Sequence, residues 1–211
     1  ELVGANADEI IFTSGATEAN NLVIKGSFLQ SKKQKKKIII SSIEHSSVYD
    51  TCKYLESLGV TIVEINVDRS GLLDLRQLEN EIYDDTILVS IIMVNNEIGT
   101  IQDVDNISRI CEKHNVPLHF DATQAAGKIN IDFHKNSGVK FLTFTSHKIY
   151  GPKGIGCLVS KVDSAGIKQP LTPLLHGGEQ EDGFRAGTLS NELIVGFGKA
   201  CEIAKTNLLE N

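Results

Sequence analysis

Three groups that could bind or transform a ligand stand directly after β-like runs in this sequence. The run at 10–13 leads into Ser-Gly-Ala-Thr at 14–17, another run ends at Asp121, and the run at 139–145 leads within a few residues into Lys148. Ligands of mostly parallel sheets bind outside the carboxyl ends of the strands. We therefore expect these three groups to meet at one edge of a sheet.

Each group has an ordinary explanation when it is taken alone. Small residues that open a helix form simple caps, Asp121 would be one more N-cap, and Lys148 would be a surface lysine. The combination is more specific, because pyridoxal phosphate needs a helix N-terminus for its phosphate, a carboxylate for its pyridine nitrogen and a lysine for the Schiff base. His45, which follows a further β-like run, adds a flat ring able to stack on the cofactor. Lys153 is a second amine close by, and local sequence does not choose between it and Lys148.

Composition indicates a globular chain and excludes several classes of protein. Hydrophobic residues make up 41% of the 211 residues and charged residues 23%, which is too apolar for a disordered chain. The formal net charge of −6 argues against direct binding to nucleic acid. The longest apolar stretch, 87–94, is too short to span a bilayer, so we expect no membrane segment. Because the chain starts at Glu1 rather than at Met, we expect it to be part of a longer protein.

The four cysteines are widely spaced and show no zinc-type pattern, so no metal site is predicted. They are Cys52, Cys111, Cys157 and Cys201. We expect them to be buried free thiols, because an unpaired cysteine behaves as a small hydrophobic residue. Free thiols favour a reducing compartment, which would be the cytoplasm, or an organelle matrix in a eukaryote.

Beta-like runs alternate with helical stretches along the whole sequence, and we see no internal repeat. This alternation predicts an α/β protein, a three-layer α/β/α fold with a mostly parallel, mixed sheet. The expected strands are 10–13, 38–41, 60–67, 87–94, 118–120, 139–145 and 156–160. The expected helices are about 16–29, 46–58, 74–82, 103–114 and 191–208. The lysine-rich segment 32–37 is expected to be a solvated connection.

Six segments together resemble one family of enzymes. They are FTSGATEANN, EHSSVYD, VNNEIGTIQD, DATQAAGK, SHKIYGPKGIG and FRAGT. In order and spacing they resemble cysteine desulfurases of the NifS/IscS type, which belong to class V of the fold-type I pyridoxal-phosphate enzymes. The resemblance runs along essentially the whole chain. It implies that residues 1–211 are the pyridoxal-phosphate-binding large domain, and that the family's N-terminal arm and C-terminal small domain are absent.

The resemblance also implies a role for individual residues. Lys148 matches the Schiff-base lysine and general acid/base, His45 the stacked histidine that helps proton transfer, and Asp121 the partner of the pyridine nitrogen. The further cofactor-binding positions that it implies are Ala16, Thr17, Thr145 and His147 at the phosphate, Asn96 and Gln124 at the phenolic oxygen of the ring, and Thr188 at the phosphate of the neighbouring subunit. Thr145 stands where the family usually has Ser, and we expect its hydroxyl to keep the hydrogen bond.

Four residues near these motifs have ordinary explanations that we favour. Asn95 and Glu97 are interpreted as turn residues. His119 is interpreted as a satisfied core or interface histidine, and Arg185 as an interface ion-pair residue rather than a substrate ligand.

The activity that the resemblance implies is removal of sulfur from L-cysteine, giving L-alanine and an enzyme persulfide for iron–sulfur cluster, thio-cofactor or transfer-RNA biosynthesis. The family carries its persulfide cysteine on a mobile loop in a C-terminal segment, and none of the four cysteines here lies in such a loop. We therefore expect this chain to bind pyridoxal phosphate but to be inactive alone. The expected partners are L-cysteine, a sulfur-acceptor protein (an iron–sulfur scaffold or a thiolation protein) and a second copy in a homodimer.

Two alternatives stay open at this point. One is another class V enzyme, such as a selenocysteine lyase or an aminotransferase. The other is a non-catalytic sulfur-transfer scaffold, although a silent homologue would have no need to keep Lys148, Asp121 and His45.

Overall fold

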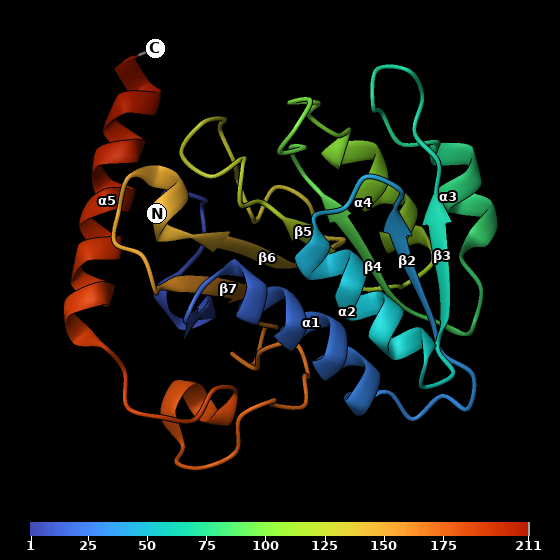
Figure 1. Cartoon of the computed structure of the whole chain (residues 1–211), viewed down its shortest axis with the longest axis horizontal. Helices are drawn as coiled ribbons and strands as arrows, with labels where there is room; N and C mark the ends of the chain where they lie inside the picture. Colours follow the sequence, from blue (N-terminus) through green and yellow to red (C-terminus); the bar gives the residue numbers. More distant parts are fainter. Residues whose placement is uncertain (211) are drawn as a thin grey trace.

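A seven-stranded sheet forms the centre of the molecule, with the strand order β1-β7-β6-β5-β4-β2-β3 (Figure 1). The computed structural model describes residues 1–210, with side chains for 1–208. The strands are β1 (Ile10–Thr13), β2 (Lys37–Ser41), β3 (Thr61–Ile65), β4 (Thr86–Ile92), β5 (Leu118–Asp121), β6 (Val139–Thr145) and β7 (Gly156–Ser160). Strand β7 is antiparallel to both of its neighbours, β1 and β6, whereas all other neighbouring strands are parallel. This confirms the predicted mostly parallel, mixed sheet.

Helices cover both faces of the sheet, as the alternation of patterns predicted (Figure 1). The helices are α1 (Ala16–Gln30), α2 (Ser46–Glu56), α3 (Leu75–Glu81), α4 (Val104–Lys113) and α5 (Asn191–Glu210), and the 3₁₀ turns are η1 (Ala7–Glu9), η2 (Ser146–Ile149) and η3 (Gln180–Gly183). Successive strand side chains point to opposite faces. Ile38 and Ile40 therefore pack with α1 and α2, whereas Ile39 packs in the cluster that includes residues of α3, α4 and α5. The three-layer α/β/α fold is confirmed.

The structure corrects two sequence-based boundaries. The helix expected at 46–58 ends at Glu56, and Gly59 then adopts a left-handed backbone with φ of 89°. The basic segment 32–37 is not solvated at its end, because Lys37 opens β2 and is buried. Its Nζ lies 3.7 Å from a carboxyl oxygen of Asp85 and packs over the ring of Tyr83, so nearby charge and aromatic surface compensate the burial.

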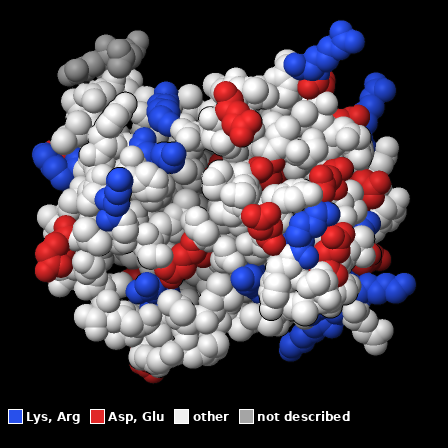
Figure 2. Space-filling model, in the orientation of Figure 1, with Lys and Arg blue, Asp and Glu red and all other residues white. Residues whose placement is uncertain are grey.

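Acidic and basic side chains are interspersed over the face of the molecule that Figure 2 shows. Cys52, Cys111 and Cys157 are buried free thiols, as expected, whereas Cys201 is half-buried. Within residues 1–210, no helix is long and apolar enough to cross a membrane.

The carboxyl ends of β1 and β6 come together through the first residue of β7. Gly156 pairs with Thr13 on one side and with Thr145 on the other. A Cβ atom added at Gly156 would lie 2.8 Å from the backbone of Gly15, so the absence of a side chain lets the turn after β1 pack onto the sheet edge. This close approach fixes where helix α1 begins.

We predict that Gly156→Ala destabilises the protein by about 1–3 kcal/mol, because the added methyl group must displace backbone rather than a flexible side chain. The free energy of unfolding in urea measures the effect. Gly198→Ala is the control, because a Cβ atom there meets nothing within 4 Å in helix α5. That control should stabilise the protein by about 0.5–1 kcal/mol. Equal stability of Gly156→Ala and the wild type would contradict the close contact.

Candidate active site

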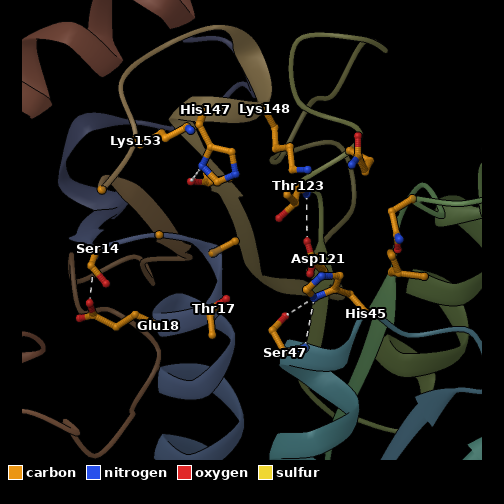
Figure 3. A pocket seen from close by; sticks show the side chains of 17 residues that line it. Ser14, Thr17, Glu18, His45, Ser47, Asp121, Thr123, His147, Lys148 and Lys153 are labelled. Atoms are coloured by element: carbon orange, nitrogen blue, oxygen red, sulfur yellow. Dashed lines mark hydrogen bonds between the residues drawn. The ribbon is translucent and has the colours of Figure 1, made fainter.

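One open cavity of about 540 Å³ lies at the carboxyl edge of the sheet (Figure 3). Its walls come from the segments that follow β1, β2, β4, β5 and β6, together with the turn before β7. The structure thus brings together all but one of the predicted site residues, which are Ala16, Thr17, His45, Asn96, Asp121, Gln124, Thr145, His147 and Lys148.

Thr188 is the exception. It is exposed and does not line this cavity. Its expected contact is with a neighbouring subunit, so its role stays a prediction.

The first turn of α1 forms one end of the cavity. Backbone N–H groups at the start of a helix have no partner within the helix, and the helix dipole favours an anion there. Glu18 holds this turn in place, because its carboxylate accepts hydrogen bonds from the Ser14 N–H at 2.9 Å and from Arg185 Nε at 2.9 Å. Burial alone would raise the pKa of Glu18, but these hydrogen bonds outweigh it and the pKa lies below its ordinary value. Arg185 is therefore an ion-pair residue within this chain.

Asp121 forms the floor of the cavity and is only 2% exposed. Its Oδ1 accepts a hydrogen bond from the Thr123 N–H at 2.9 Å, and its Oδ2 accepts one from Asn20 Nδ2 at 2.7 Å. Leu118 and Phe120 of the same strand pack on the opposite face of the sheet. The alternation along β5 therefore turns Asp121 toward α1.

His119 lies below Asp121 on the same face and is fully buried. Its ring nitrogens are 2.8 Å from Ser90 Oγ and 3.0 Å from Thr143 Oγ1, so both have partners. Burial lowers the pKa of His119 to about 4, which the nearby Asp121 carboxylate only partly opposes. The expectation of a satisfied core histidine is confirmed.

His45 is the N-cap of helix α2 and lies at the cavity, with Ser47 below it in Figure 3. The residue is exposed at the cavity, and its Nδ1 accepts a hydrogen bond from the Ser47 N–H at 3.1 Å. Ser47 Oγ lies 2.9 Å from the same nitrogen. These two contacts anchor one edge of the ring.

Lys148 and Lys153 both line the cavity, but they occupy different places. In Figure 3, Lys148 points toward Thr123 and Asp121, whereas Lys153 lies beside His147. Lys148 is carried by the short turn η2 and is therefore the amine on the Asp121 side. His147 is next to both lysines, and burial together with their charges lowers its pKa. The cavity thus gathers positive groups opposite the N-terminus of α1, an arrangement suited to an anionic ligand.

Thr145 ends β6 and lines the cavity, and its role at a phosphate stays a prediction. Thr145 Oγ1 donates a hydrogen bond to the Ile155 carbonyl at 3.0 Å and lies 3.3 Å from His147 Nδ1. Asn95, in contrast, is a turn residue as expected, because its Oδ1 accepts from the N–H groups of Glu97 and Ile98.

Glu44 lies outside the cavity wall, one residue before His45. Its Oε1 accepts hydrogen bonds from Ser41 Oγ and from the Ile92 N–H at 2.7 Å, while its Oε2 is buried without a hydrogen-bond partner among the described residues. Burial, with a contribution from the Asp121 charge, raises the pKa of Glu44 to about 8 in spite of these hydrogen bonds. The carboxyl that precedes His45 is therefore mostly neutral at pH 7.

Asn20 and Ser47 are two polar residues next to the site that the sequence patterns did not reveal. Asn20 is fully buried in α1, four residues after the first residue of the helix, and Ser47 is buried two residues after His45. Polar side chains at such positions, near a helix start that faces the strand ends, are the signal that could have found them.

Comparisons with known proteins assign the chain to one family. The aminotransferase class V family model matches residues 1–210. The chain is 50% identical over 213 residues to the cysteine desulfurase IscS of Buchnera aphidicola subsp. Acyrthosiphon pisum, which covers 99% of this chain and 50% of the relative. It is 46% identical over 207 residues to the mitochondrial cysteine desulfurase of Arabidopsis thaliana, covering 97% of this chain and 44% of the relative.

Solved structures show the same fold. A NifS-like protein superposes with a TM-score of 0.92 at 41% identity, over 99% of this chain and 56% of the other. A second structure, described as SspA in complex with cysteine, superposes with a TM-score of 0.88 at 42% identity, over 95% of this chain and 57% of the other. The chain therefore spans about half the length of the relatives that it matches.

We predict that Glu44→Gln flattens the dependence of stability on pH. A carboxyl whose pKa is raised by folding stabilises the folded state fully below its ordinary pKa of 4.5, and this contribution is lost as the pH rises toward about 8. One such proton gives a slope of about 1.4 kcal/mol per pH unit, which glutamine cannot contribute. Urea unfolding at a series of pH values across this range measures the slope.

The exposed Glu97 provides the matched control, and Glu97→Gln should leave the wild-type slope unchanged. Parallel pH curves for the wild type and Glu44→Gln would show that Glu44 is ionised in the folded protein.

Proposed function

The chain belongs to the aminotransferase class V family, and we propose that its protein is a cysteine desulfurase that uses pyridoxal phosphate to take sulfur from L-cysteine, leaving L-alanine and an enzyme persulfide. One observation carries the proposal. A helix N-terminus, a buried carboxylate and a lysine border a single cavity in a fold shared with NifS-like proteins. The identity of about half the aligned residues with a bacterial IscS supports the same activity.

The residues of the cavity fit pyridoxal phosphate. The first turn of α1, beginning at Ala16 and Thr17, offers backbone N–H groups to a phosphate, and Asp121 offers carboxylate oxygens at the other end. Thr123 Oγ1 is buried in the wall without a hydrogen-bond partner among the described residues, which leaves one more polar atom for a ligand. When bound, the cofactor would supply an electron sink for the bonds at the substrate's Cα.

The protein's own side chains would bind and orient the cofactor and move a proton. Asp121, already held by two N–H donors, would accept a hydrogen bond from the pyridine N–H and orient the ring. His45 would stack on the ring face and restrict access of water to it. Lys148 Nζ, on the Asp121 side of the cavity, would hold the cofactor and move a proton to and from the substrate's Cα. Asn96 and Gln124 would bind the phenolic side of the ring.

We further propose that residues 1–211 are the cofactor-binding domain and that the persulfide forms on a cysteine outside the rigid elements described here. Cys52 and Cys111 lie inside helices, and burial raises the pKa of each thiol to about 12. A thiol must ionise to attack sulfur, so these two are poor nucleophiles. Cys157 lies in β7, where burial holds its pKa well above the ordinary value of a thiol, and Cys201 lies in α5.

The expected partners follow from the activity. A persulfide must pass its sulfur to an acceptor protein, an iron–sulfur scaffold or a thiolation protein. A second copy of the chain would place Thr188 at the partner's phosphate. The bacterial and mitochondrial origins of the relatives make the cytoplasm or an organelle matrix the proposed location.

We predict that the cofactor attaches covalently to Lys148. The full-length protein, loaded with pyridoxal phosphate and reduced with borohydride, should carry the added mass on the peptide containing Lys148. Lys148→Ala should lose this mass and lower cysteine turnover by about 10²-fold or more, because both the attachment and the proton transfer are lost. Lys153→Ala, in the same cavity, should keep the adduct. An adduct on Lys153 in the wild type would overturn the assignment.

The products formed from L-cysteine distinguish a desulfurase from other class V enzymes. The full-length protein should release alanine from L-cysteine and accumulate persulfide on one of its cysteines. Release from selenocysteine alone, or transfer of the amino group to a keto acid without sulfur release, would instead identify another class V activity. Absence of any covalent cofactor adduct would favour a non-catalytic scaffold.

A further inference from the structure

The side-chain amide of Asn20 connects the two sides of the site. The residue is fully buried, and its Nδ2 donates to Asp121 Oδ2 at 2.7 Å and to Ser47 Oγ at 2.9 Å. The amide orientation is determined by chemistry, because a carboxylate can only accept and the nitrogen must therefore face Asp121. Both hydrogens of the amide are consequently in use.

The donors around His45 determine which of its nitrogens carries the proton. The Ser47 N–H can only donate, so Nδ1 of His45 accepts that hydrogen bond at 3.1 Å. Ser47 Oγ already accepts from Asn20, and its own hydrogen is free to point at Nδ1, 2.9 Å away. With two donors directed at it, Nδ1 has no room for a hydrogen of its own. The neutral ring then carries its proton on Nε2.

We propose that Asn20 is a positioning residue that, through Ser47, couples Asp121 to His45 and holds His45 in the Nε2–H tautomer. The chain of contacts is continuous: Asp121 Oδ2, Asn20 Nδ2, Ser47 Oγ and His45 Nδ1. It joins β5, α1 and α2, three elements whose relative placement sets the distance between the carboxylate and the ring.

The tautomer has a consequence for chemistry at the cavity. His45 lines the cavity, and Nε2 is the ring nitrogen that Ser47 does not occupy. At Nε2, His45 therefore offers the cavity a hydrogen-bond donor rather than a lone pair. The tautomer follows from hydrogen bonds within this chain, whereas its use in catalysis rests on the proposed function.

The test is nitrogen NMR of the cofactor-free, full-length protein with ¹⁵N-labelled histidine, in alkaline buffer where free imidazole is neutral. The His45 ring signal is assigned as the one that disappears in His45→Gln. The wild type should show His45 with a protonated Nε2 and a hydrogen-bonded, unprotonated Nδ1. A protonated Nδ1 in the wild type would overturn the proposal.

Ser47→Ala removes only the hydroxyl and keeps the backbone N–H. The Nδ1 signal of His45 should move downfield, because one of its two hydrogen bonds is lost. Ser46→Ala is the matched control, since Ser46 is the exposed neighbour in the same helix turn. An unchanged His45 signal in Ser47→Ala would refute the role of the hydroxyl.

Asn20→Leu tests the coupling, because leucine has a similar size but no donor, and Asn20 does not contact His45 directly. The Nδ1 signal should shift although the ring's own contacts are intact. Asn21→Leu is the control, because the Asn21 amide bonds only to the Thr17 carbonyl of its own helix. If Asn20→Leu folds and the Nδ1 signal of His45 does not shift, the coupling does not exist. If Asn20→Leu fails to fold, the Ser47→Ala variant still tests the tautomer.

A kinetic readout separates this inference from the proposed function. If the protein is a desulfurase, Ser47→Ala should lower kcat for cysteine about fivefold, the effect of one lost hydrogen bond, with KM and pyridoxal-phosphate affinity unchanged. A protein that shows the NMR shifts but no cysteine turnover would sustain the positioning role and remove the desulfurase assignment. A rise in KM together with an equal fall in cofactor affinity would indicate that Ser47 only maintains the structure of the site.

Discussion

A buried carboxylate at the end of β5 is the constraint on which the rest of the site depends. An ionised carboxyl that is almost wholly removed from water must be compensated by hydrogen-bond donors. The loop after the strand supplies one through Thr123, and helix α1 supplies the other through Asn20. Asn20 can reach Asp121 only if α1 packs over β5 in this register. The need to solvate one carboxylate thus also places the first turn of α1, where an anion would bind.

Burial drives two ionisable groups near Asp121 toward their neutral forms. It raises the pKa of Glu44 to about 8, although Oε1 of Glu44 accepts two hydrogen bonds. It lowers the pKa of His119 to about 4, with a hydroxyl group beside each ring nitrogen. Asp121 has a hydrogen-bond donor on each of its two oxygens, an arrangement that suits a negative charge. The proposed ligand would meet that charge at one point of the cavity floor.

The order of elements along the chain was sufficient to predict the sheet, its layers and the edge where the ligand-binding groups meet. Asp121 and Lys148 could be found because each follows a strand, and strand ends can be recognised locally. Asn20 and Ser47 could not be found in this way. Asn20 lies 101 residues from Asp121 and 27 from Ser47, so their pairing exists only after the helices have docked. Local sequence likewise did not distinguish Lys148 from Lys153, and the preference for Lys148 came from the family resemblance.

If the protein is a desulfurase as proposed, the rigidity of the site indicates that cofactor binding and sulfur acceptance would need different parts of it. A ring held between Asp121 and His45 requires groups fixed by buried hydrogen bonds, and the described site consists of such groups. A nucleophile that attacks sulfur at the ring and then presents a persulfide to another protein has to be exposed and has to move. Cys52, Cys111 and Cys157 are locked into helices and a strand, where burial keeps their thiols protonated. In the proposed desulfurase, the stability that would orient the cofactor would therefore make the same elements unsuitable for carrying the sulfur away.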